Sequence, residues 1–235
     1  MIGGVGLSFR EKVKLWRATE SAKLRKMSFG KKLSYIFTYY WKWMLLFLVV
    51  LMFCGYVADV IVQAGKETVL EGFFTNDDYN FFPADKIQDE FSQRLGLGKD
   101  EKLVFDDSLY VSLDGGATEY SAASNGKIIA YMAAQELDFI VSTETVFDYY
   151  TGDVPMLDLK ELLSPELYAR LEPYMIEGLD VDGNPCYAGI DMTHSRYISG
   201  SENAQYAEET YVMFFPYSAP HRELLNTYID FCFEN

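Results

Sequence analysis

The longest uncharged apolar segment of the chain runs from Trp43 to Ala58, between Lys42 and Asp59. As a helix this segment is about 24 Å long, shorter than the roughly 30 Å of a bilayer core. Lys42 and Asp59 can extend the span, because charged side chains at its ends reach the headgroups. Tyr and Trp residues crowd the N-terminal edge, as is typical of a membrane interface. The pattern predicts one transmembrane helix over residues 35–62. Its apolar anchor residues are Trp43, Leu46, Leu48, Val50, Phe53 and Tyr56.

The charges on the two sides of this segment are opposite in sign. Residues 1–42 hold ten Lys or Arg against two Glu, a net charge of +8 in a chain whose total is −15. The remaining residues therefore carry −23. Since cytoplasmic flanks are enriched in Lys and Arg, we expect residues 1–34 to form a basic cytoplasmic tail and residues 63–235 an extracellular domain of a single-pass cell-membrane protein. The excess of Lys and Arg that usually flanks the cytoplasmic end of a membrane span explains the charge of the tail more simply than a helix lying on anionic headgroups.

Two other interpretations of the apolar segment remain open. Val62-Gln63-Ala64 before Gly65 resembles the cleavage site of a signal peptide, although about 40 residues precede the apolar run, far more than an ordinary n-region. Cys54 is a candidate lipidated cysteine, but Phe53 occupies a position that requires a small residue. A thiol within an apolar helix is the simpler account of Cys54.

After residue 62 the pattern alternates between strand-like and helix-like segments. Residues 66–74 fit either a helix or a first strand. Residues 137–142 form a short apolar run, as expected of a buried central strand. This alternation predicts an α/β or α+β domain of about 170 residues. Further strands are expected at 103–113 and 210–217 with a hairpin over 180–193, and helices at 83–97, 118–135 or from 127, 143–150, 157–163, 164–174 and 220–233.

Metal-binding patterns are incomplete. Asp180, Asp182, Asn184 and Asp191 match positions 1, 3, 5 and 12 of a calcium loop, but Pro185 replaces the required Gly and position 12 is not Glu. A polar hairpin turn explains the same residues. The two histidines, His194 and His221, have no partner at zinc spacing. We therefore expect no metal site.

Catalytic and cofactor patterns are also missing. Ser195 directly follows His194, but sequence neighbours rarely face each other as nucleophile and base, and no G-x-S-x-G elbow occurs. Gly115-Gly116 lacks the Lys-Ser/Thr of a phosphate loop. Cys186 and Cys232 either pair as a disulfide or remain buried thiols. The sequence thus favours a protein that is not an enzyme and has no cofactor, and its acidity argues against nucleic-acid binding.

Several segments resemble a known family. The run KIIAYMAAQELDFIVSTETVFDYY with LDLKELL after it, then YAGIDMTHSRYI and TYVMFFPYSAPHRELLNTYIDF, resemble the type II solute-binding proteins of ABC transporters. The opening KLSYIFTYYWKW is similar to uncharacterised single-pass membrane proteins of clostridial-type Gram-positive bacteria. The resemblance implies a reduced type II periplasmic-binding fold, because two full lobes need roughly 300 residues. None of these segments is a ligand-contacting signature, so the ligand-binding residues stay unknown.

Together these features favour a membrane-tethered interaction module. Its acidic, aromatic-rich domain of single-lobe size suits a non-catalytic partner of another envelope or transport protein. Its lipid partner is the bilayer that the apolar segment crosses. The alternative is a receptor that delivers a small solute, such as a sugar or peptide, to an ABC-type uptake system.

Overall fold

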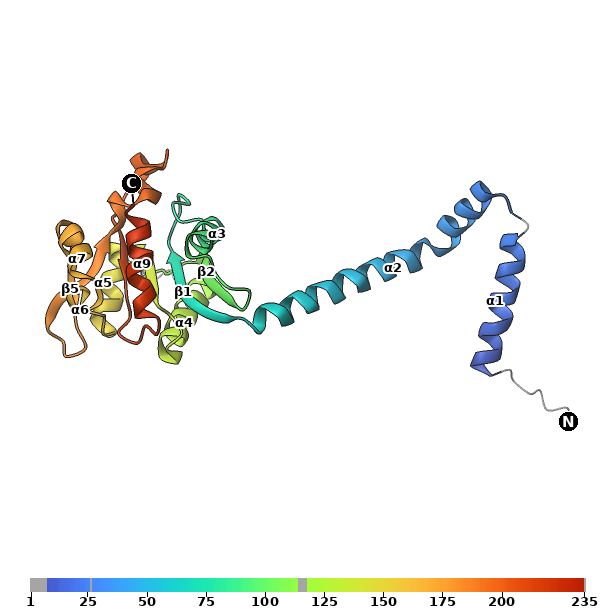
Figure 1. Cartoon of the computed structure of the whole chain (residues 1–235), viewed down its shortest axis with the longest axis horizontal. Helices are drawn as coiled ribbons and strands as arrows, with labels where there is room; N and C mark the ends of the chain where they lie inside the picture. Colours follow the sequence, from blue (N-terminus) through green and yellow to red (C-terminus); the bar gives the residue numbers. More distant parts are fainter. Residues whose placement is uncertain (1–7, 26, 114–117, 235) are drawn as a thin grey trace. The chain divides into compact units, whose positions relative to one another are not determined.

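The computed structural model describes residues 8–25, 27–113 and 118–234, and the chain divides into two compact units, Met1–Gly65 and Lys66–Asn235. Figure 1 shows the elements of each unit. The second unit, residues 66–235, is called the C-terminal domain below.

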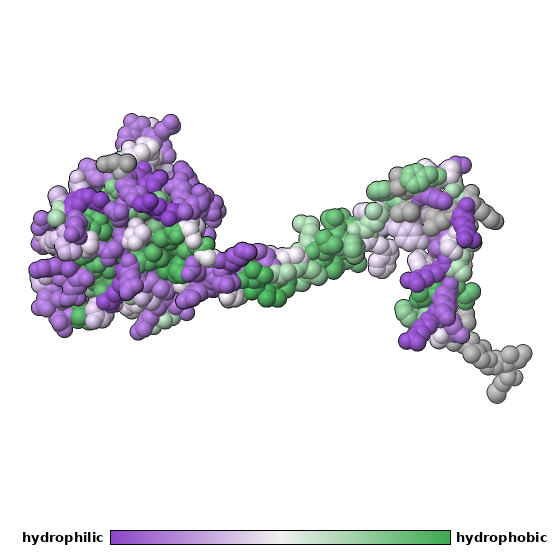
Figure 2. All heavy atoms as spheres, viewed as in Figure 1, coloured by the Kyte–Doolittle hydropathy of each residue, from purple (hydrophilic) through white to green (hydrophobic). Residues whose placement is uncertain are grey.

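The first unit consists of two helices, α1 (Phe9–Arg25) and α2 (Phe29–Ala64). Within α2, residues Phe37–Ala64 are long and apolar enough to cross a membrane, by length and composition. At about 1.5 Å per residue this stretch measures about 42 Å. Its surface is a largely hydrophobic band in Figure 2. The six anchor residues all lie in α2 with exposed side chains.

Helix α1 contacts the beginning of α2 through polar and aromatic groups. The carboxylate of Glu20 accepts hydrogen bonds from the hydroxyls of Tyr35 and Tyr40, each at 3.1 Å. The Trp16 ring packs edge-on against Tyr40, with 6.4 Å between centroids. Glu20 also pairs with Lys23 at 2.9 Å. These contacts occupy one face of α1.

The C-terminal domain is built on a six-stranded mixed sheet with the order β2-β1-β3-β6-β5-β4. Strand β1 lies between β2 and β3 and runs parallel to both, whereas β6 is antiparallel to β3 and β5, and β5 to β4. The strands are β1 (Glu67–Thr75), β2 (Glu101–Leu109), β3 (Phe139–Thr143), β4 (Met175–Leu179), β5 (Pro185–Asp191) and β6 (Tyr211–Phe214).

Helices cover both faces of this sheet. One buried cluster joins the sheet to α3, α6, α7 and α9, and the other joins it to α4 and α5. The helices are α3 (Ala84–Leu95), α4 (Glu119–Ala134), α5 (Glu144–Asp153), α6 (Leu159–Leu162), α7 (Pro165–Leu171), α8 (Arg196–Ser199) and α9 (Arg222–Cys232), with short 3₁₀ turns η1 (Glu172–Tyr174), η2 (Met192–His194) and η3 (Ala204–Tyr206). The described residues of the C-terminal domain thus form a three-layer α/β arrangement, which confirms the α/β part of the predicted fold class. The resemblance to a reduced type II periplasmic-binding fold stays a prediction.

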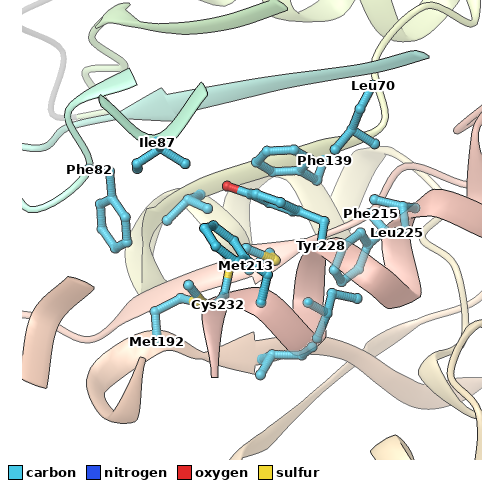
Figure 3. Packing of buried hydrophobic residues seen from close by; sticks show 14 of the residues in the cluster. Leu70, Phe82, Ile87, Phe139, Met192, Met213, Phe215, Leu225, Tyr228 and Cys232 are labelled. Carbon is cyan, nitrogen blue, oxygen red and sulfur yellow. The ribbon is translucent and has the colours of Figure 1, made fainter. Parts of the chain in front are cut away.

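Aromatic rings dominate the larger core. The ring of Tyr228 on α9 stacks on Phe139 of β3, with 4.6 Å between centroids (Figure 3). Phe91 of α3 packs against Tyr228 at 5.0 Å. Because α3 and α9 both contribute to this stack, it joins two helices to the central strands.

Most predicted elements are present, with local differences. Residues 67–75 form a strand, so the helical option for this segment is wrong. Helix α4 begins at Glu119 rather than after Gly126, because Thr118 and Ser121 form a capping box. The hairpin strands lie at 175–179 and 185–191, since the polar residues 180–184 form only its turn. The predicted turn at Asp114-Gly115-Gly116 lies outside the described residues.

Candidate binding hollows at the two ends of the parallel strands

The sheet has a topological switch point between β1 and β3. The chain passes from β1 outward to β2 and then returns to β3 on the other side of β1. In open α/β sheets, ligands bind outside the carboxyl ends of the strands at such a point. A hollow of about 210 Å³ lies there, lined by segments that follow β1, β2 and β3 and precede β6. We call it the carboxyl-end hollow.

Asn76 organises the floor of this hollow. Its side-chain amide donates to the carbonyl of Val111 at 2.8 Å and its amide oxygen accepts from the Val111 N–H at 2.9 Å. Its own carbonyl accepts from the Tyr211 hydroxyl at 3.0 Å. Asn76 adopts a left-handed conformation with φ 57°, which Asn tolerates better than most residues. This residue therefore ties the ends of β1, β2 and β6 together.

Acidic and aromatic side chains surround the opening. Asp78, Glu208 and Glu209 are exposed, and none forms an ion pair with another described residue. The Tyr79 ring lines the hollow and stacks on Tyr206 with 6.3 Å between centroids. The hollow is smaller than the roughly 300–1,000 Å³ of most drug-sized ligand sites. Its charge and rings suit a positively charged group.

A second hollow lies at the opposite, amino-terminal end of β3. It has a volume of about 370 Å³ and is lined by Thr68, Glu71, Tyr131, Gln135, Glu136, Pro220 and His221. We call it the amino-end hollow. Asp138, the residue immediately before β3, holds His221 at the side of this hollow.

Asp138 is fully buried and its carboxylate is saturated with donors. One oxygen, Oδ1, accepts from the backbone N–H of His221 at 2.8 Å. The other, Oδ2, accepts from the backbone N–H of Glu71 at 2.8 Å and lies 2.9 Å from Nδ1 of His221. Because the carboxylate can only accept a hydrogen bond, the bonded Nδ1 carries a proton. In the neutral ring the other nitrogen, Nε2, is then an acceptor.

Glu71 is the unusual group of the amino-end hollow. Glu71 is only 7% exposed, and its carboxyl group has no hydrogen bond or ion pair with another described residue. Burial raises the pKa of Glu71 to about 7, and the nearby Glu136 adds to the rise. The positive charge of Lys127 opposes this rise in pKa, although its ammonium group is also paired with Asp106 at 2.6 Å.

The residues singled out from the sequence lie elsewhere and have structural roles. Asp180 accepts from the backbone N–H groups of Asp182 and Asn184, as expected of a hairpin turn. Ser195 caps α8 by accepting from the Ile198 N–H, whereas the His194 ring packs on Tyr174. In the described part of the chain, no three His, Cys, Asp or Glu side chains lie close enough to hold a metal ion.

The cysteines are unpaired. Cys186 is half-buried at the start of β5, and Cys232 is buried in α9. Burial raises the pKa of Cys186 to about 11, so the thiol stays protonated at neutral pH. Both residues are therefore thiols that pack in the domain.

Sequence reasoning missed Glu71 and Asp138. An Asp immediately before an apolar strand, in LDFIVS, was the available signal, and so was a Glu within the apolar end of β1. Neither residue has a motif partner nearby in the sequence. No known protein family matches the chain, and neither the curated proteins nor the solved structures contain a match to it.

Proposed function

We propose that this chain is a single-pass membrane protein whose C-terminal domain is a non-catalytic interaction module outside the cytoplasmic membrane. The apolar stretch Phe37–Ala64 of α2 supports the membrane span. The excess of Lys and Arg before it supports a cytoplasmic N-terminus. In this proposal α1 lies on the cytoplasmic side and the acidic domain faces the envelope.

The observation that carries the interaction is the carboxyl-end hollow. Three exposed carboxylates without ion partners among the described residues surround a small, open depression with tyrosine rings. Such a surface attracts Lys and Arg side chains of another protein, and rim charges of this kind raise association rates and fix orientation. We infer that the partner is an envelope or transport protein that presents a basic segment.

A photocrosslinking experiment tests this proposal. Tyr110 lines the hollow and is 41% exposed, whereas Tyr217 is 43% exposed and lies away from it, so the two positions form a matched pair. A benzophenone amino acid at position 110 in the full chain should yield a defined protein adduct in intact cells, and the same group at 217 should not. The adduct should disappear in Glu208→Gln/Glu209→Gln. Equal adducts at both positions, or none, would refute the proposal.

The alternative is a small-solute receptor with a reduced type II periplasmic-binding fold. The position of the hollow at the β1/β3 switch point favours this second candidate, because solutes bind there in related architectures. A solute that binds only the folded domain stabilises it by about 2.7 kcal/mol at a hundredfold excess over Kd. A saturable rise of several degrees in melting temperature with one sugar or peptide, lost on Asn76→Ala, would select the receptor.

A further inference from the structure

The described lining of the amino-end hollow contains acidic side chains and no Lys or Arg. Glu71 and Glu136 both line it. It also adjoins the C-terminal end of α4, whose last turn has no basic residue and which carries the partial negative charge of the helix dipole. The positive groups near Glu71 are Lys127, which is paired with Asp106, and Lys102 on β2.

The hollow contains several groups that can accept hydrogen bonds. Glu71 is more than nine-tenths buried, lines the hollow and has no partner among the described residues. Asp138 holds Nδ1 of His221 at 2.9 Å, so the remaining ring nitrogen, Nε2, is an acceptor when the ring is neutral. Glu136 supplies a further carboxylate. The hollow thus offers two carboxylates and a ring nitrogen as acceptors beside the polar side chains of Thr68, Tyr131 and Gln135, and its described lining has no Lys or Arg.

We propose that the amino-end hollow binds an alkylammonium group, whose three N–H donors are met by the carboxylates of Glu71 and Glu136 and by Nε2 of His221. An ammonium group carries three donors and no acceptor, which matches this set. The ammonium group belongs either to a small free amine or to a lysine side chain of a partner.

This inference goes beyond the proposed docking at the carboxyl-end hollow and does not depend on it. The two hollows lie at opposite ends of β3 and share no residue. Failure of the crosslinking experiment therefore does not count against the ammonium site. Failure of ammonium binding likewise does not count against docking at the carboxyl-end hollow.

Binding of n-butylammonium to the full chain in lipid nanodiscs tests the site, by calorimetric titration at pH 8. We expect saturable binding with a Kd in the millimolar range. Tetramethylammonium has the same charge but no N–H donors, and it should bind at least about tenfold more weakly because it cannot make the hydrogen bonds. Equal binding of the two cations, or no saturable binding of n-butylammonium, would overturn the proposal.

Two variants locate the site. Glu71→Gln keeps the shape of the side chain and should lower the affinity for n-butylammonium about tenfold or more, because a charge-assisted hydrogen bond is lost. Glu67→Gln changes an exposed carboxylate of the same strand and should leave the affinity within about twofold. Undiminished binding by a folded Glu71→Gln chain would refute the assignment.

The pH dependence gives a further signature. Ammonium binding requires the Glu71 carboxylate, and with a pKa of about 7 its ionised fraction rises about tenfold between pH 6 and pH 8. The affinity for n-butylammonium should rise by about the same factor, and binding at pH 6 should release protons. The groups that face Glu71 are Glu136, Lys127, Asp138, Lys102 and His221. An affinity independent of pH in the wild-type chain would contradict the site.

Two more probes identify the source and exclude a metal. A blocked Gly-Lys-Gly tripeptide that binds more tightly than n-butylammonium indicates a partner's lysine, and weaker binding indicates a small free amine. Both results support an ammonium site. Zn²⁺, Mg²⁺ or Ca²⁺ binding that depends on Glu71, in the absence of n-butylammonium binding, would replace the ammonium site by a metal site.

Discussion

Asp138 and His221 are 83 residues apart in sequence, yet the buried carboxylate of Asp138 binds both the backbone N–H of His221 at 2.8 Å and its Nδ1 at 2.9 Å. The same carboxylate binds the backbone N–H of Glu71. Asp138 therefore connects β1, the start of β3 and the start of α9, and it orients the imidazole that lines the amino-end hollow.

Replacing Asp138 should destabilise the domain strongly. Asp138→Ala leaves two buried or half-buried backbone N–H groups and the His221 ring without their acceptor. We expect the free energy of unfolding to fall by about 2–5 kcal/mol, measured by urea denaturation of the full chain in detergent. Asp148→Ala removes an exposed carboxylate from α5 and should change it by less than about 0.5 kcal/mol. Comparable effects of the two variants would show that the Asp138 contacts contribute little.

Two glycines should respond to alanine with opposite signs. A Cβ at Gly72 in β1 would clash with the ring of Phe139 on the paired strand, whereas a Cβ at Gly126 in α4 meets nothing within 4 Å. Gly72→Ala should lower the free energy of unfolding by about 1–3 kcal/mol through overpacking. Gly126→Ala should raise it by about 0.5–1 kcal/mol, because Ala favours the helix. Thermal unfolding of both variants in parallel checks the prediction, and a shift of the same sign would contradict it.

Glu71 should make stability depend on pH. Its folded-state pKa, about 7, lies above its ordinary value of 4.5, so the folded chain binds more protons than the unfolded chain between these values. The contribution of Glu71 to stability therefore falls as pH rises through this window. Glu71→Gln should match the wild type near pH 4 and exceed it by up to about 3 kcal/mol above pH 8, measured by urea denaturation.

Glu67→Gln, which changes an exposed carboxylate of the same strand, serves as the control for this pH series. Its difference from the wild type should stay small at every pH, because an exposed carboxylate titrates alike in both states. A Glu71→Gln difference that is constant from pH 4 to pH 8 would show that Glu71 ionises normally in the folded chain.

The proposed topology can be checked with protease added to intact protoplasts. Because the N-terminal flank is basic and α2 contains one candidate span, we expect digestion of the C-terminal domain and protection of residues 1–34. Epitope tags at the two ends, followed by immunoblotting, report the result. Loss of the N-terminal tag first would reverse the orientation, and a soluble chain beginning at Gly65 would indicate cleavage instead of anchoring.

The sequence by itself determined the features that depend on local pattern. A long apolar run between charged residues specifies one helix of membrane-spanning length, since hydropathy and length are local properties. Pro83 with Gly96 located α3, because caps act within one turn. The beginning of α4 stayed open in the sequence between Thr118 and the residue after Gly126, and the structure decided for Thr118. The alternation of strand-like and helix-like segments predicted an α/β or α+β class.

Only the tertiary structure decided how these elements pair and what they bring together. Residues 67–75 have an ambiguous pattern, and pairing with two parallel neighbours makes them an interior strand of the sheet. Glu71 is an ordinary Glu in the sequence, and burial beside Glu136 changes its ionisation. The amino-end hollow assembles from β1, the end of α4 and the residues before α9. Packing between segments far apart in the sequence therefore creates it, and no single segment could have predicted it.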